Sequence, residues 1–365
     1  MISFSVGTNW DLSLIDAAHE LNQQNKIRQG IYYCISSFYG SIPKTVLASA
    51  RPNWRLCGNF AGLKTFIEKA HKVNIGIDYT ANAFCLGDYS TDLKCLGGLL
   101  SLLEDLGVDR IIVAHPVIAE AVLLYTSRMK IGLSTILNID DVRSIEVWRE
   151  FLKSKRFDQV CVALEANRDP HFLRFATVFR EKGIELQLMV NEFCSVNGPC
   201  HGIFRDSCYM GHSHGIKDVC DNYPMSRCTN IRTKNPVSWL KAPFILPSWV
   251  KDYNEKLYID SFKITGRTAN TDYIKQMMTY YMTKTNPENL LELWPQLETI
   301  YTPNLTSERA RESYPTIPTT YLLHFHLPWV RFSLPKKSFS CRHTLCDVCG
   351  YCKETLDLIQ LNQRG

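Results

Sequence analysis

The chain has 365 residues, of which 45% are hydrophobic and 21% are charged. This is ordinary globular composition, and it excludes a chain that is mostly disordered, collagen-like or coiled coil. The 41 basic and 36 acidic residues leave a formal net charge of +5, a balance that neither requires nor excludes a nucleic-acid partner.

Short apolar segments alternate along most of the chain with longer segments of helical periodicity. The expected strands are residues 2–7, 31–38, 74–80, 110–114, 130–135, 159–164, 185–190 and 260–264. Helices are expected from near Trp10 and over 96–106, 142–152, 170–180 and 271–283. Strands that alternate with helices form parallel sheets, and eight such units fit a closed barrel better than an open sheet. The sequence therefore predicts an α/β protein with a (β/α)8 TIM-type barrel.

We expect two regions in the chain. Residues 1–285 would form the barrel, with a cysteine-rich loop at 194–235 after the seventh strand. Residues 286–365 mix Pro, aromatic and short apolar segments without a clear period, so we expect a C-terminal extension that packs on the barrel. The connection after the seventh strand is long, and long connections in compact domains are usually functional.

The N-terminus, MISFSVGTNWD, lacks the basic segment and long apolar run of a signal peptide. No run of about 18 uncharged apolar residues occurs, so no membrane insertion is expected. These features predict a cytoplasmic protein. Thiols stay reduced in that compartment, so clustered cysteines there are expected to bind metal.

Nine of the 14 cysteines fall into two groups. The first is Cys194, Cys200, Cys208, Cys220 and Cys228, and the second is Cys341, Cys346, Cys349 and Cys352. The tail spacing, C-x4-C-x2-C-x2-C, suits the corners of an iron–sulfur cluster. Zinc and free thiols are the alternatives for the tail, although zinc more often uses two separated C-x2-C pairs.

Polar residues recur at the carboxyl ends of the expected strands, where barrel enzymes have their active sites. The candidate catalytic residues are Arg51, His115, Glu165, Arg168, Glu192 and Arg267. The arginines suit carboxylates, and the glutamates and the histidine suit proton transfer. Each also has a structural alternative, which is a salt bridge, the orientation of a neighbour or a loop hydrogen bond. His201, inside the cysteine loop, is expected to be a hydrogen-bonding loop residue.

Several segments resemble the collagenase-like peptidase family U32. Met189–Cys194 resembles the family's "MVNE-x-C" strand end, and Lys263–Arg267 is similar to its "lysine-isoleucine-x-glycine-arginine" strand. Tyr39–Ser41 with Ala50–Pro52 looks like the early "YGS…GRP" segment. The resemblance spans most of residues 1–285.

The better understood members of that family are oxygen-independent hydroxylases. They carry a 4Fe–4S cluster on four cysteines, prephenate is implicated as the oxygen donor, and they act on RNA bases or the ubiquinone ring. The resemblance implies Cys194, Cys200, Cys220 and Cys228 as the ligands at the barrel mouth, with Cys208 as the alternate to Cys220. It also implies a small-molecule or RNA substrate and a paralogous or electron-donor protein partner.

Two other functions remain open at this point. One is an accessory subunit whose iron–sulfur or zinc sites are structural. The other is a peptidase, although no nucleophile–histidine pair or hydrolytic zinc motif is apparent in the sequence.

Overall fold

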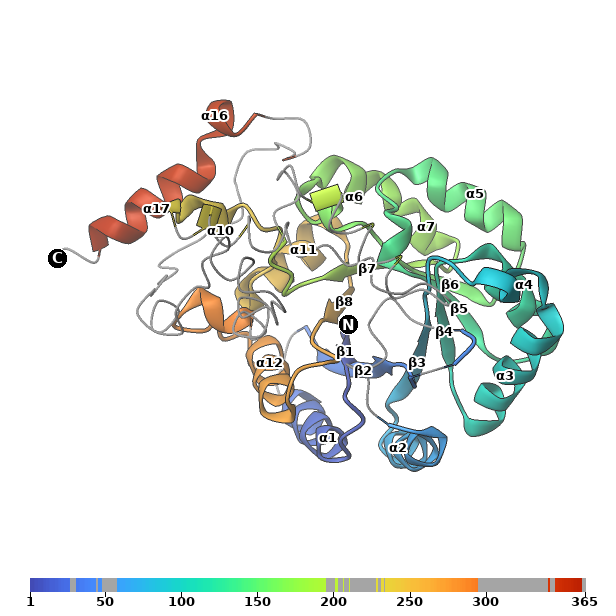
Figure 1. The fold of residues 1–365 in the computed structure, drawn as a ribbon. Coiled ribbons are helices and arrows are strands. Elements are labelled where there is room, and N and C mark those ends of the chain that lie inside the picture. The colour runs from blue at the N-terminus through green and yellow to red at the C-terminus, as the bar shows by residue number, and fades with distance from the viewer. Residues whose placement is uncertain are drawn as a thin grey trace, which may run out of the picture.

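The computed structural model describes residues 1–26, 31–43, 45–47, 58–194, 201–202, 206, 210, 228, 231–232, 234–294, 341 and 345–362. Eight parallel strands pair in sequence order, and β8 pairs with β1 to close a barrel (Figure 1). The strands are β1 (Ile2–Gly7), β2 (Tyr33–Gly40), β3 (Gly76–Ala81), β4 (Arg110–Val113), β5 (Lys130–Leu133), β6 (Phe157–Cys161), β7 (Glu185–Met189) and β8 (Ser261–Ile264). The predicted (β/α)8 class is confirmed.

Helices connect the strands and surround the barrel (Figure 1). The α-helices that follow β1 to β7 are α1 (Ser13–Lys26), α2 (Phe60–Lys72), α3 (Leu93–Leu106), α4 (Pro116–Tyr125), α5 (Val142–Leu152), α6 (Pro170–Ala176), α7 (Val178–Glu181), α10 (Val237–Leu240) and α11 (Val250–Leu257). Those that follow β8 are α12 (Thr271–Thr283), α16 (Cys346–Cys349) and α17 (Tyr351–Asn362). Short 3-10 helices are η2 (Gly87–Thr91), η3 (Thr135–Leu137), η4 (Leu164–Arg168), η5 (Pro247–Trp249) and η6 (Leu290–Leu293).

Local capping explains where several helices begin. The side chains of Asn59, Asp92 and Asn270 accept hydrogen bonds from backbone N–H groups in the first turns of α2, α3 and α12. Gly107 ends α3 in the left-handed conformation, with φ of 99°. The expected bounds of α5 and α12 are confirmed, whereas the helix expected over 170–180 is divided into α6 and α7 around Thr177.

The outward faces of the strands form the main core. Phe4, Phe38, Val160 and Phe262 are fully buried among the residues of the surrounding helices. Alternate strand residues point into the barrel, because successive side chains of a strand face opposite ways. These inward positions are unusually polar for this fold, whose lumen is normally filled by branched apolar residues.

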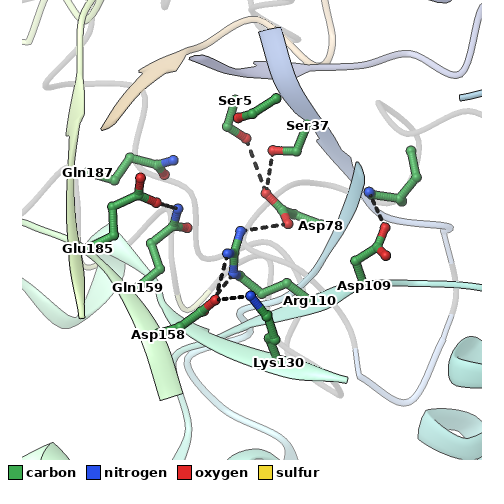
Figure 2. Close-up of polar contacts among 12 residues, drawn as sticks. Ser5, Ser37, Asp78, Asp109, Arg110, Lys130, Asp158, Gln159, Glu185 and Gln187 are labelled. Atoms are coloured by element: carbon green, nitrogen blue, oxygen red, sulfur yellow. Dashed lines mark hydrogen bonds and ion pairs between the residues drawn. The ribbon is translucent and has the colours of Figure 1, made fainter. Parts of the chain in front are cut away.

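The amino end of the lumen holds an ion-pair network, here called the barrel floor. Asp78 accepts hydrogen bonds from Ser5 and Ser37 at 3.3 and 2.7 Å, and its other oxygen lies 3.0 Å from Arg110 Nη1 (Figure 2). Arg110 also donates two bonds of 2.9 Å to Asp158. The floor joins β1, β2, β3, β4 and β6 across the lumen, so it stabilises the closed barrel.

The described part of the C-terminal extension lies beside the barrel. Helix α17 packs against α10, which precedes β8 (Figure 1). None of the described helices has the apolar stretch of membrane-spanning length that crossing a bilayer requires.

Candidate functional site

Two buried asparagines fix the chain at the carboxyl end of the barrel. The Asn191 amide accepts from Thr265 N at 2.7 Å and donates to Tyr273 Oη at 2.9 Å, so it joins the ends of β7 and β8. The Asn167 amide donates to the Met189 carbonyl at 2.6 Å and so fastens η4 to the end of β7. These bonds set the positions of Glu165, Glu192 and Cys194, which all lie at the barrel mouth.

Cys194, His201 and Glu165 form a continuous hydrogen-bonded chain. Cys194 Sγ lies 2.9 Å from His201 Nδ1, and His201 Nε2 lies 2.8 Å from Glu165 Oε1. Since a carboxylate accepts only, the simplest assignment places the imidazole proton on Nε2. Nδ1 then accepts from the Cys194 thiol, which makes His201 a group that can receive the thiol proton.

The surroundings of Cys194 favour its neutral thiol form. Burial raises its pKa to about 12, Arg232 opposes the shift, and the charges of Glu192, Cys228 and Glu165 add to it. The thiol packs against Cys161, Leu164 and Met189. The charge of Cys228 acts on Cys194, so these two members of the first cysteine group lie within electrostatic range of each other at the mouth.

Glu192 lies among the reactive groups of the mouth. It is half-buried, and its charge acts on Cys161, Cys194, Lys263 and Tyr273. This position is consistent with the proton-transfer role predicted for it.

Arg267 is buried at the same end of the lumen. Its Nη1 donates to Thr80 Oγ1 at 2.5 Å and lies 3.4 Å from Ser41 Oγ. Both partners are neutral hydroxyls, and these two contacts orient the guanidinium.

His115 occupies the N-cap of α4. Its Nδ1 accepts a 3.3 Å hydrogen bond from Val117 N, and burial lowers its pKa. The ring is therefore neutral at physiological pH, and the structure shows the loop hydrogen bond that was the structural alternative for this residue.

Arg168 lies beside the tail cysteines. Its carbonyl accepts from Cys341 N at 3.3 Å, and its Nη1 donates to the Leu240 carbonyl at 3.0 Å. Burial raises the pKa of Cys341, while the charge and side-chain hydrogen bond of Arg168 lower it. Cys352 Sγ donates to the same Leu240 carbonyl at 3.5 Å.

The four tail thiols lie within electrostatic range of one another. Burial is the largest cause that raises the pKa of Cys352, and the charge of Arg168 opposes it. The charges of the other three tail thiols raise this pKa further. A bound cation would remove this mutual repulsion, and thiolates are the ligands that iron–sulfur clusters and zinc share, so the donor chemistry fits a metal. As placed, however, no three Cys, His, Asp or Glu side chains among the described residues are grouped so that they could hold a metal ion.

Part of the predicted site lies outside the described residues. These positions are Arg51, Cys200, Cys208 and Cys220. For the mouth, Cys194 and Cys228 are therefore the only predicted ligands that the structure places. The described cysteines form no disulfide.

The sequence did not reveal the link between Cys194, His201 and Glu165. His201 follows Cys194 closely in the chain, but Glu165 comes from the preceding βα connection. The parallel pairing of β6 with β7 brings the ends of these strands together, so no sequence spacing reports this contact. Lys263 was also absent from the candidate catalytic residues.

Comparison with known proteins identifies a related family. Residues 39–171 match the model of Peptidase family U32. The chain is 24% identical over 295 residues to an uncharacterized protease of Methanocaldococcus jannaschii, an alignment that covers 80% of this chain and 85% of that protein.

Solved structures resemble this chain at low sequence identity and with TM-scores below 0.5. A U32 peptidase has 15% identity and a TM-score of 0.44, over 73% of this chain and 93% of that one. A GH113 β-1,4-mannanase has 7% identity and a TM-score of 0.38, over 77% and 98%. The fold assignment therefore depends on the strand order of this chain itself.

Proposed function

We propose that this chain is a member of the U32 family and an iron–sulfur oxidoreductase, an oxygen-independent hydroxylase that takes oxygen from a prephenate-like donor. The observation that carries the proposal is the position of Cys194, buried at the carboxyl end of the barrel and within electrostatic range of Cys228 and Glu192. The acceptor is an RNA base or a small molecule, and the protein acts in the cytoplasm. The match to the family model over residues 39–171 supports family membership.

The environment of Cys194 suits a metal ligand better than a free nucleophile. Nucleophilic cysteines typically have depressed pKa values, whereas burial raises the pKa of Cys194 to about 12. A metal deprotonates a coordinating thiol outright. His201, bonded to Cys194 and to Glu165, is placed to receive that proton.

In this proposal Cys194, Cys200, Cys220 and Cys228 would hold a 4Fe–4S cluster at the mouth, with Cys208 as the alternate to Cys220. When bound, the cluster would supply Lewis-acid or one-electron chemistry. Arg267 would bind a carboxylate of the donor, and Glu192 would transfer a proton. Arg51, His115 and Arg168 remain predicted contributors.

The tail cysteines would hold a second 4Fe–4S cluster. Cys341, Cys346, Cys349 and Cys352 lie within electrostatic range of one another, and Arg168 connects this group to η4, which also carries Glu165. The second cluster would relay electrons from a protein donor or fasten α17 to α10.

One observation favours a second candidate function, a thiol peptidase. A nucleophile, a base and an orienting carboxylate in hydrogen-bond contact are the parts of a catalytic triad, and Cys194, His201 and Glu165 have that arrangement. The name of the methanogen relative agrees with this alternative.

Iron and sulfide counts after anaerobic purification test the proposal. We expect two clusters of about four irons each, with one lost in Cys194→Ala and the other in Cys349→Ala. Cys34→Ala is the matched control, because Cys34 is buried in β2 outside both groups and should leave the iron count unchanged. Zinc without iron in the parent protein would refute the redox function.

His201→Gln separates the two candidates. It should retain the mouth iron, because His201 is not a proposed ligand, whereas a peptidase would lose activity on casein by about 100-fold or more without its base. Peptidase activity in metal-free protein that disappears in this variant would establish the second function.

A further inference from the structure

The lumen contains a buried lysine that the proposed function does not use. Lys263 on β8 is only 7% exposed, and its Nζ lies 4.0 Å from the centre of the Tyr39 ring. Its neighbours in sequence, Phe262 and Ile264, belong to the outward-facing core, so Lys263 faces the lumen. The Tyr39 ring is itself held in place, because the Tyr39 hydroxyl donates to the Ile264 carbonyl at 3.3 Å.

The burial of Lys263 favours its neutral amine. Burial lowers its pKa, and the guanidinium of Arg267 lowers it further, while Cys161, Asp78 and Glu192 act in the opposite direction. A neutral lysine amine is the nucleophile that adds to carbonyl compounds. A surface lysine is almost entirely protonated at neutral pH and adds much more slowly.

Arg267 is the second residue in the lumen, beside Lys263, that can bind a group of a ligand. Its guanidinium acts electrostatically on Lys263, and its Nη1 is oriented by Thr80 and Ser41. A guanidinium offers five N–H donors in a planar fork that matches a carboxylate. An amine that adds to carbonyls and a guanidinium that binds carboxylates together select a molecule with both groups.

We propose that Lys263 binds an oxo carboxylic acid as an imine, with Arg267 holding its carboxylate. The Nζ lone pair attacks the carbonyl carbon, and a proton passes from nitrogen to oxygen to give a carbinolamine. Loss of that oxygen as water forms the C=N bond, so the reaction consumes no oxidant or reductant. The second amine proton leaves with that hydroxyl as water, so the step balances within the adduct.

Reductive trapping on the full-length protein tests this proposal and needs no metal. The anaerobically purified protein is incubated at neutral pH with pyruvate and cyanoborohydride, then analysed by intact mass and peptide mapping. We expect one adduct, with the mass of pyruvic acid less one oxygen atom, on Lys263. Lys263→Arg should lose it, and circular dichroism shows whether that variant folds.

A second lysine provides a matched control. Lys284 Nζ lies 4.2 Å from the Tyr33 ring centre, a similar cation–π contact, but Lys284 is exposed. Lys284→Arg should leave the adduct unchanged. Label spread over exposed lysines, or no label on Lys263, would overturn the proposal, whatever the iron content of the protein.

The role of Arg267 is tested by a change of probe. Arg267→Gln should reduce trapping of pyruvate by about tenfold or more, because a charge-assisted contact with the carboxylate is lost. Trapping of acetaldehyde, which has no carboxylate, should fall by less, because for this probe the variant loses only the effect of the Arg267 charge on the pKa of Lys263. An equal loss for both probes would refute carboxylate binding by Arg267.

Discussion

Removing the arginine of the barrel floor should destabilise the protein strongly. Arg110 makes one bond to Asp78 and two to Asp158, and their side chains are only 15%, 3% and 15% exposed. Arg110→Met would leave Asp78 in the lumen with only the Ser5 and Ser37 hydroxyls. Breaking a buried ion pair by removing one partner costs about 3–5 kcal/mol, so we expect a loss of that size in the free energy of unfolding.

Urea unfolding followed by circular dichroism measures the effect, and Lys130→Met is the control. Lys130 pairs with the same Asp158 at 3.0 Å, but its side chain is 55% exposed, so it should contribute at most about 1 kcal/mol. The Arg110→Met deficit should also shrink as pH falls, because an unpaired buried carboxylate takes up a proton. Equal losses in the two variants would show that burial does not determine the strength of this network.

Three further predictions follow from single groups. In metal-free protein at neutral pH, Cys194 should react with iodoacetamide about 1,000-fold more slowly than an unperturbed thiol, because its pKa of about 12 leaves little thiolate. Mass mapping compares its labelling with that of the exposed Cys346, and equal labelling of the two would contradict the prediction. Burial raises the pKa of Glu185, so the stability linked to its protonation is fully present below the unfolded pKa near 4.5 and is lost as pH rises through the folded value. Glu185→Gln should therefore become more stable relative to the parent from pH 4 to pH 7. Thermal melts with the opposite trend would refute the sign. Tyr253→Phe should cost about 1–3 kcal/mol, because it leaves the buried Asn167 carbonyl without the 2.5 Å bond from the Tyr253 hydroxyl, and a urea midpoint that does not move would contradict this.

The barrel could be predicted because its signals are local. Eight β-forming segments occur in the sequence, several of them followed by helical periodicity, and the bounds expected for α5 and α12 agree with the structure. The strand expected over 159–164 ends at Cys161, because the chain then turns into η4. Asn167 of η4 donates a hydrogen bond to the Met189 carbonyl of the neighbouring strand. Such a tertiary contact has no counterpart in the local sequence.

The site could be predicted less completely, because its contacts join distant segments. The strand-end rule identified Glu165 and Glu192, since parallel strands place their carboxyl ends together. It gave no indication that Glu165 would hold His201, nor that Arg168 would lie with Cys341 and Leu240. Lys263 was not among the candidate residues, and the structure drew attention to it by placing the Tyr39 ring 4.0 Å from its Nζ.

The short helix η4 constrains how related sequences can diverge. Its Glu165 contacts His201 of the cysteine-rich loop. Arg168, three residues after Glu165, contacts Cys341 of the tail. A 3-10 helix has about three residues per turn, so inserting or deleting one residue between them would rotate one side chain away from its partner by about 120°. Alignments of relatives with both cysteine groups should therefore show no gap in this segment. Homologues that end before the tail are free to replace the arginine while keeping the glutamate.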